Sequence, residues 1–350
     1  MSTNTCVIAG ALGVAGRALL QELETRKDWD IIALSRRKPD FSTRARFIGV
    51  DLTDAAESSR ALKAVSDATH VFFAAYTPRA ALADQVGPNL AMLVNLVTAI
   101  ESASPRLRHV AIVQGSKWYG NHLGPYKTPA KENDPRHMPP NFYYDQQDWI
   151  GSQQRGKPWN WSSWRPHGLC GVSVGSPMNQ LNALAVYAII SRELNLPLRF
   201  PGQLGAFRAV YQFTDASLLA RAMLWGSDTP ACANEAFNLT NGEFERWEHI
   251  WPAVSEYFGL RPGPVQTISL SRFMADKEPL WARIGEKYGL KRHTLQELVN
   301  WEFADWVYSS AFDQMSSLGK VRRAGWNEVL DAETMFHGLF DRLRAGHLIP

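Results

Sequence analysis

The sequence predicts an α/β fold in which a doubly wound parallel sheet is followed by a smaller, mainly helical part that binds the substrate. Strand-like and helix-like segments alternate through the first 116 residues, and a glycine-rich turn joins the first strand to the first helix. The fourth strand is apolar almost throughout. Such a strand is expected where helices cover both faces of a parallel sheet.

The predicted strands and helices alternate along the first third of the chain. Short apolar runs predict strands at 5–10, 29–35, 44–52, 69–76 and 107–116. Apolar residues at helical spacing predict helices at 14–26, 56–67 and 81–103. WNWSSWRP, which ends at Pro166, and EAFNLTNG at 235–242 are predicted to add further strands.

The composition is that of an ordinary globular enzyme, with 350 residues of which 45% are hydrophobic and 20% charged. The net charge is only 37 − 34 = +3, so we expect no nucleic-acid partner. Cys6, Cys170 and Cys232 are too widely spaced for a disulfide framework or a zinc site, and we expect no metal. No signal peptide or membrane-spanning run is evident, so we expect no membrane partner and a cytoplasmic location.

Gly10, Gly13 and Gly16 form G-x-x-G-x-x-G between the first strand and the first helix. Such a turn lets the backbone approach a pyrophosphate and points helix N-terminal amides at it. A tight turn that binds nothing is the alternative, but the place in the first β–α unit favours dinucleotide binding. The spacing resembles that of the extended branch of the short-chain dehydrogenase/reductase superfamily.

We expect the chain to form two parts. We expect residues 1–170 to form a Rossmann domain that binds NADP, with strands and a helix contributed by 197–240. Residues 171–196 and 241–350 have helical patterns broken by Pro and Gly. We expect these two stretches to form the substrate-binding or lid region.

The end of the second strand predicts which dinucleotide is bound. NAD-binding domains carry an acidic residue near this point, which holds the ribose 2′-hydroxyl. Here Ser35 is followed by Arg36 and Arg37, and an arginine fork suits a 2′-phosphate, so we expect NADP(H). A solvated basic turn is the alternative. Asp51 and Leu52 resemble the adenine-contacting pair of the superfamily, although Asp51 could equally be a turn or helix-cap residue.

The fifth strand ends in VQGSK, which contains Gln114 and Lys117. Ligands bind at the carboxyl ends of such strands, so we expect Gln114 beside the cofactor and Lys117 in the active site. A long irregular loop, typical of a functional segment, then leads to the NFYY motif. Most short-chain reductases carry Tyr-x-x-x-Lys here, but neither Tyr143 nor Tyr144 is followed by that lysine.

Five segments, in order over essentially the whole chain, resemble the progesterone 5β-reductase/iridoid synthase-like family, in a bacterial-type form. They are GSKWYG…LGPY (115–126), NFYYDQQD (141–148), WSSWRPHGLCGVSVGSPMN (161–179), NEAFNLTNGEFERWEHIW (234–251) and DKEPLW (276–281). The resemblance implies reduction of the C=C bond of an activated enone with NADPH.

The resemblance also implies roles for single residues. Lys117 and Tyr143 match the catalytic pair, which leaves Tyr144 as a packing residue, and the segment at Pro166 would pass the nicotinamide carboxamide. Tyr76 and Trp118 stand where many members have Trp and His, so the pocket would be reshaped. The implied substrate-pocket residues are Tyr76, Trp118, Tyr126, Phe312 and Met315.

The expected chemistry is 1,4-reduction. Tyr143 would donate a hydrogen bond to the carbonyl oxygen as the enolate forms, and the Lys117 ammonium would favour the tyrosinate and strengthen that donor. His167 is a candidate acid or base, but a histidine in a Pro-Gly loop more often has a structural role. Ser173 and Asn179 would face the cofactor or the pocket, with a purely structural role as the alternative.

Other functions stay open at the level of the sequence. They are an extended short-chain carbonyl reductase, a nucleotide-sugar epimerase or dehydratase, and a catalytically inactive NADP-sensing protein. The small-molecule partner is expected to be an enone or a related activated alkene, and the chain could form a homodimer.

Overall fold

The computed structural model describes residues 4–350 and contains one parallel seven-stranded sheet with the strand order β3-β2-β1-β4-β5-β6-β9. This is the doubly wound order, so the predicted fold class is confirmed. The strands are β1 (Asn4–Ala9), β2 (Trp29–Leu34), β3 (Arg46–Ile48), β4 (His70–Phe73), β5 (His109–Val113), β6 (Asn160–Pro166) and β9 (Glu235–Leu239).

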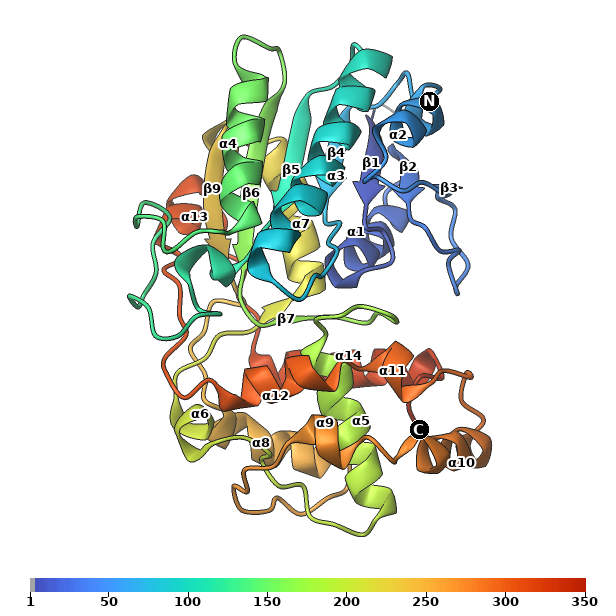
Figure 1. Ribbon diagram of the computed structural model, residues 1–350, viewed down its shortest axis with the longest axis vertical. Coiled ribbons are helices and arrows are strands. Elements are labelled where there is room, and N and C mark those ends of the chain that lie inside the picture. The colour runs from blue at the N-terminus through green and yellow to red at the C-terminus, as the bar shows by residue number, and fades with distance from the viewer. Residues whose placement is uncertain (1–3) are drawn as a thin grey trace.

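Helices cover both faces of this sheet (Figure 1). One face packs against α1 (Val14–Glu24) and α7 (Ala216–Ser227), and the other against α2 (Ala55–Leu62), α3 (Leu82–Ala103) and α4 (Phe142–Gln154). Successive strand residues point to opposite faces, and both faces are buried. The apolar runs of the sequence therefore mark strands with two covered faces.

Helix α3 is long and apolar enough, by length and composition alone, to cross a membrane. Here it packs between α2 and α4 against the sheet, and residues such as Leu93, Leu96 and Ile100 are fully buried in that contact. In this structure α3 is therefore a helix that covers one face of the sheet.

The second part of the molecule is a group of helices below the carboxyl ends of the strands in Figure 1. Aromatic side chains, among them Phe200, Trp247, Trp251 and Tyr308, fill its core. Its helices are α5 (Gln180–Glu193), α6 (Leu204–Arg208), α8 (Trp247–Tyr257), α9 (Leu270–Phe273), α10 (Glu278–Tyr288), α11 (Leu295–Leu298), α12 (Trp301–Ser309) and α14 (Ala332–Ala345).

Short elements connect the two parts. Strands β7 (Leu169–Cys170) and β8 (Thr214–Asp215) pair in parallel between them, and α13 (Gly319–Ala324) returns to pack on β9. The 3₁₀ helices η1 (Ser116–Tyr119) and η2 (Pro230–Cys232) follow β5 and α7 respectively.

The helical pattern predicted from residue 171 onward is wrong over its first nine residues. Residues 171–179 have no helical turn, and α5 begins only at Gln180, where the Asn179 side chain accepts a hydrogen bond from the Asn182 amide. Pro177 and the left-handed backbone at Gly175 (φ +72°) oppose a helix in this stretch.

Candidate active site

A cavity of about 700 Å³ lies at the carboxyl ends of the strands, between the sheet and the helical part. It contains nearly all the residues predicted to bind the cofactor, although Gly16 lies outside its lining. The predicted residues that line it are Gly10, Gly13, Ser35, Arg36, Arg37, Asp51, Leu52, Gln114, Lys117, Tyr143 and Pro166.

The glycine turn is shaped by close contacts. Gly10 has a φ of +76°, and a Cβ there would lie 2.6 Å from the Ala74 carbonyl oxygen. A Cβ at Gly16 would lie 2.2 Å from the Gly10 carbonyl oxygen, so Gly16 lets α1 approach the turn. Gly13 caps α1 without a side chain, and the first turn of this helix carries no acidic residue. The positive end of α1 is therefore open to an anion at the cavity.

The two arginines after β2 have different surroundings. The Arg37 Nη2 donates to the Val174 carbonyl oxygen at 3.0 Å, and its backbone amide donates to the Ser35 hydroxyl. Arg36 faces Asp51. Hydrogen bonds from Thr53, and secondarily the charge of Arg36, hold the pKa of the Asp51 carboxyl below its usual value. Asp51 therefore stabilises the turn before α2 while also lining the cavity.

The two adjacent tyrosines of NFYY differ in their hydroxyl contacts. The Tyr144 hydroxyl donates to the Trp118 carbonyl oxygen at 2.7 Å and accepts from the His137 amide at 2.9 Å. The Tyr143 hydroxyl lies over Gly115, 3.5 Å from where a Cβ of that residue would be. Within residues 4–350 it has no hydrogen-bond partner. Tyr143 lines the cavity and Tyr144 does not, so only Tyr143 can offer its hydroxyl to a ligand there.

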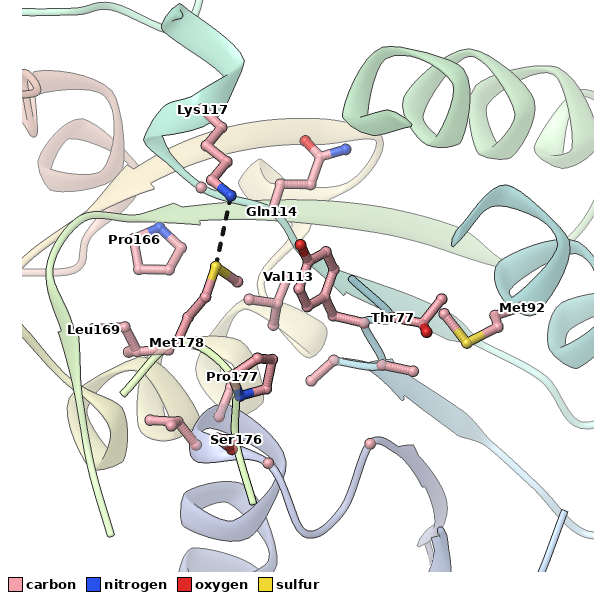
Figure 2. A pocket seen from close by; sticks show the side chains of 18 of the residues that line it. Thr77, Met92, Val113, Gln114, Lys117, Pro166, Leu169, Ser176, Pro177 and Met178 are labelled. Atoms are coloured by element: carbon pink, nitrogen blue, oxygen red, sulfur yellow. Dashed lines mark hydrogen bonds between the residues drawn. The ribbon is translucent and has the colours of Figure 1, made fainter. Parts of the chain in front are cut away.

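The expected lowering of the Tyr143 pKa is not found. Burial raises the pKa of this phenol, and the neighbouring Tyr76 raises it further. Burial also lowers the pKa of the Lys117 ammonium. The Lys117 Nζ lies 3.6 Å from the Met178 Sδ and 5.9 Å from the centre of the Tyr76 ring (Figure 2). Tyr143 is thus a protonated phenol at neutral pH, which is the form that donates a hydrogen bond.

Neighbouring amides position the Tyr143 backbone. The Gln114 Nε2 donates to the Tyr143 carbonyl oxygen at 2.8 Å, while the Gln114 Oε1 accepts from the Ser163 hydroxyl at 2.7 Å.

Gln147 occupies the place of the usual helix lysine, four residues after Tyr143, and its Oε1 accepts from the Arg165 Nη2 at 2.9 Å. A cation for this site therefore has to come from another element, and η1 supplies Lys117.

Of the five residues expected in the substrate pocket, Tyr76 alone lines the cavity. Trp118 lies beneath the Arg165 guanidinium at 3.6 Å and meets the Tyr144 ring edge-on. The other three also lie outside the lining: Tyr126 packs against Tyr119 and Phe312, and the Met315 carbonyl oxygen accepts from the Ala130 amide.

Other side chains take their places in the lining. They are Phe142, Gln146, Met178, Tyr211, Phe303 and Trp306. Phe142 and Gln146 could have been found, because they flank Tyr143 on the first turns of α4. Phe303 and Trp306 come from α12, more than 150 residues away, and only the fold brings them to the cavity.

His167 also lines the cavity, but it is buried and its Nδ1 lies 2.7 Å from the Ser116 hydroxyl. Burial lowers its pKa to about 3, so the imidazole is neutral at physiological pH. Asn179 donates to the Gly171 carbonyl oxygen and the Ser173 hydroxyl, and neither Asn179 nor Ser173 lines the cavity. In the described part of the chain, no group of three His, Cys, Asp or Glu side chains is placed to hold a metal.

A protein family and several known proteins are similar to this chain in sequence. The family described as PRISE-like Rossmann-fold domain matches residues 49–350. A short chain dehydrogenase, gsfE, from Penicillium aethiopicum is 32% identical over 99% of both chains. The (S)-8-oxocitronellyl enol synthase ISY1 of Nepeta racemosa and the 3-oxo-Delta(4,5)-steroid 5-beta-reductase of Arabidopsis thaliana are each 29% identical, over 99% of this chain and 93% of theirs.

Solved structures agree on the fold. The UDP-glucose 4-epimerase of Thermotoga maritima superposes with a TM-score of 0.67 at 12% identity, over 97% of this chain and 99% of that one. WbmG from Bordetella bronchiseptica, in complex with NAD, superposes with a TM-score of 0.68 at 15% identity, over 99% and 95%. With a family match over most of its length and a 32% identical relative over nearly all of it, the chain belongs to the PRISE-like Rossmann-fold family of short-chain dehydrogenases/reductases.

Proposed function

We propose that the protein is an NADPH-dependent reductase of activated C=C bonds, which adds hydride to the β-carbon of an enone. The observation that carries this proposal is the unpaired Tyr143 hydroxyl, which shares one cavity with the Lys117 ammonium and apolar walls such as Phe142 and Trp306. A phenol with no hydrogen-bond partner among residues 4–350 and an ammonium whose one acceptor there is a weak thioether are suited to an oxygen that gains negative charge. The names of the enol synthase and steroid 5-beta-reductase relatives point to the same class of reaction.

The cavity fits a phosphorylated dinucleotide at its opposite end. Gly10, Gly13 and the open N-terminus of α1 would hold the pyrophosphate. Arg36 and Arg37 would hold the 2′-phosphate, and their joint charge of two matches that dianion. When bound, NADPH supplies the hydride.

Tyr143 would act on the substrate carbonyl. Its hydroxyl would donate a hydrogen bond to the carbonyl oxygen, where negative charge develops as the enolate forms. The Lys117 ammonium would add a positive charge at the same site. Such donors are effective when they are already oriented and little water competes with them. Tyr143 is only 7% exposed, and the Asn141 cap and the Gln114 amide hold its backbone in place. The α-carbon proton would come from water.

Loss of NADPH absorbance on addition of 2-cyclohexen-1-one tests the proposal, with a panel of cyclic and acyclic enones run beside it. We expect NADPH-dependent turnover of at least one of them, with the saturated ketone as product. No turnover across the panel, with NADPH still bound, would contradict the proposal and favour an NADP-sensing protein. Interconversion of nucleotide sugars instead would favour an epimerase.

A further inference from the structure

Residues 174–178, here called the strap, follow β7, and Gly175 to Met178 line the cavity. At one end, the Val174 carbonyl oxygen accepts from Arg37, and the Gly175 amide donates to the Glu297 carbonyl oxygen of α11. In the middle, the Ser176 hydroxyl oxygen lies 3.9 Å from where a Cβ of Gly13 would be. The strap thus passes from the arginines, over the glycine turn, to the catalytic end.

The far end of the strap carries Met178, whose side chain points at Lys117 (Figure 2). The Met178 Sδ accepts a hydrogen bond from the Lys117 Nζ at 3.6 Å. It is the one acceptor that the structure gives this ammonium within residues 4–350, and no carboxylate of that stretch forms an ion pair with it. A thioether is a weak but polarisable acceptor, so it can contact a buried cation without neutralising its charge.

The remaining groups around Lys117 do not fix its position. The Tyr76 ring lies 5.9 Å from the ammonium, and Tyr143 borders the same cavity. The positive charge of Lys117 also acts on the His122 ring. Burial lowers the pKa of His122 to about 4, with the charge of Lys117 acting in the same direction, so this ring is neutral at neutral pH. A neutral histidine, two phenols and a thioether surround a single cation.

At the other end of the strap, Gly175 packs closely against the Arg37 guanidinium. A Cβ at Gly175 would lie 2.2 Å from the Arg37 Nη1, so this glycine leaves room for the guanidinium. The left-handed backbone at Gly175 also favours glycine over any other residue. Arg36 has no such contact with the strap in the described part of the chain and faces Asp51 instead.

We propose that Met178 is a positioning residue that holds the Lys117 ammonium at the reacting end of the cavity, and that Arg37 anchors the strap which carries it. The catalytic consequence rests on the proposed enone reduction. The strap connects Arg37, which would bind the 2′-phosphate, to Lys117, which would act on the substrate.

Met178→Leu tests the first half of the proposal, because leucine keeps the volume and removes the acceptor. Met223→Leu is the matched control, since Met223 is buried in α7 away from the cavity. In Met178→Leu we expect kcat to fall about threefold to fivefold, as for the loss of one weak hydrogen bond, with NADPH affinity changed less than about twofold. The control should behave as the wild type.

The pH profile separates positioning from packing. Loss of the acceptor disfavours the ammonium, so the alkaline limb of kcat should move to lower pH in Met178→Leu by about half a unit. A fall in kcat with an unmoved limb would show that Met178 acts by packing alone and would overturn the proposal. An unchanged kcat would overturn it as well.

Arg37→Leu tests the anchor. If Arg37 only binds the 2′-phosphate, this variant raises the KM for NADPH and leaves kcat at saturating NADPH unchanged, which would overturn the anchoring role. We expect kcat to fall several-fold in addition, together with faster hydrogen exchange in residues 174–178.

The Lys117 titration can be followed without turnover by NMR of isotopically methylated lysines in the NADP⁺-bound protein, with Lys117→Met identifying the signal. If the wild type reduces no enone, the proposed function fails, but this titration still reports whether Met178 stabilises the Lys117 ammonium. A lower Lys117 pKa in Met178→Leu than in the wild type supports positioning, and equal values would refute it.

Discussion

Replacing Tyr143 by phenylalanine tests the assignment of the catalytic hydroxyl. The change removes a hydroxyl that has no hydrogen-bond partner among residues 4–350, so no donor or acceptor of the protein loses a partner. The free energy of unfolding should change by no more than about 0.5 kcal/mol. The ring remains and continues to pack against Phe142, 4.4 Å away between ring centroids, so the cavity keeps its shape.

The catalytic cost should be far larger than the structural one. Loss of one oriented donor to a developing oxyanion lowers kcat about 10²–10³-fold, which corresponds to about 2.7–4 kcal/mol. The assay is steady-state oxidation of NADPH with an enone that the wild type reduces, together with NADPH binding measured by fluorescence. We expect a large loss of kcat and a dissociation constant for NADPH that is nearly unchanged.

Tyr144→Phe is the matched control. It removes a hydroxyl that donates to the Trp118 carbonyl oxygen and accepts from the His137 amide, so it should lower the free energy of unfolding by about 1–3 kcal/mol. Its kcat should fall far less than that of Tyr143→Phe. If Tyr143→Phe kept full turnover while Tyr144→Phe lost it, the assignment would be refuted.

Three further predictions concern the cofactor end, the buried lysine and the glycine turn. Arg36→Ala combined with Arg37→Ala should weaken NADPH binding far more than NADH binding in titrations of each, and equal weakening would refute the 2′-phosphate assignment. Burial holds the pKa of Lys117 in the folded protein below its pKa in the unfolded chain. Between these two pKa values the unfolded chain binds more protons than the folded protein, so the free energy of unfolding rises with pH in that window. Lys117→Met should therefore abolish turnover yet raise the free energy of unfolding by about 1 kcal/mol in urea titrations at neutral pH, and a less stable variant would contradict this reasoning. Gly16→Ala should destabilise the protein by about 1–3 kcal/mol, because the new Cβ would meet the Gly10 carbonyl oxygen, and wild-type stability would show that α1 can shift.

The sequence predicted features that depend on neighbouring residues or on the repeated β–α pattern. Successive residues of β4, such as Val71 and Phe72, belong to opposite buried faces, which is why its apolar run indicated a doubly covered sheet. The carboxyl ends of parallel strands meet at one edge, so Gly10 after β1 and Gln114 after β5 could be assigned to one crevice before the structure was known.

Other features depended on contacts between distant segments. Trp118 was expected in the pocket, but Arg165 from β6 covers its ring and places it outside the cavity. The choice between Tyr143 and Tyr144 required the start of α4 at Phe142, which turns the two hydroxyls in different directions. Met178 was missed because its stretch was predicted to be helical, whereas residues 171–179 form no helical turn and Gly175 to Met178 line the cavity.

The position of hydride transfer is the most direct test of the central claim. The wild-type protein is incubated with 2-cyclohexen-1-one, or with whichever enone of the panel it reduces, and NADPH deuterated at the nicotinamide C4. The product is then examined by mass spectrometry and NMR. The proposed 1,4-reduction predicts the saturated ketone with deuterium at the β-carbon. Deuterium on the carbinol carbon of an allylic alcohol would show carbonyl reduction instead and would contradict the roles given to Tyr143 and Lys117.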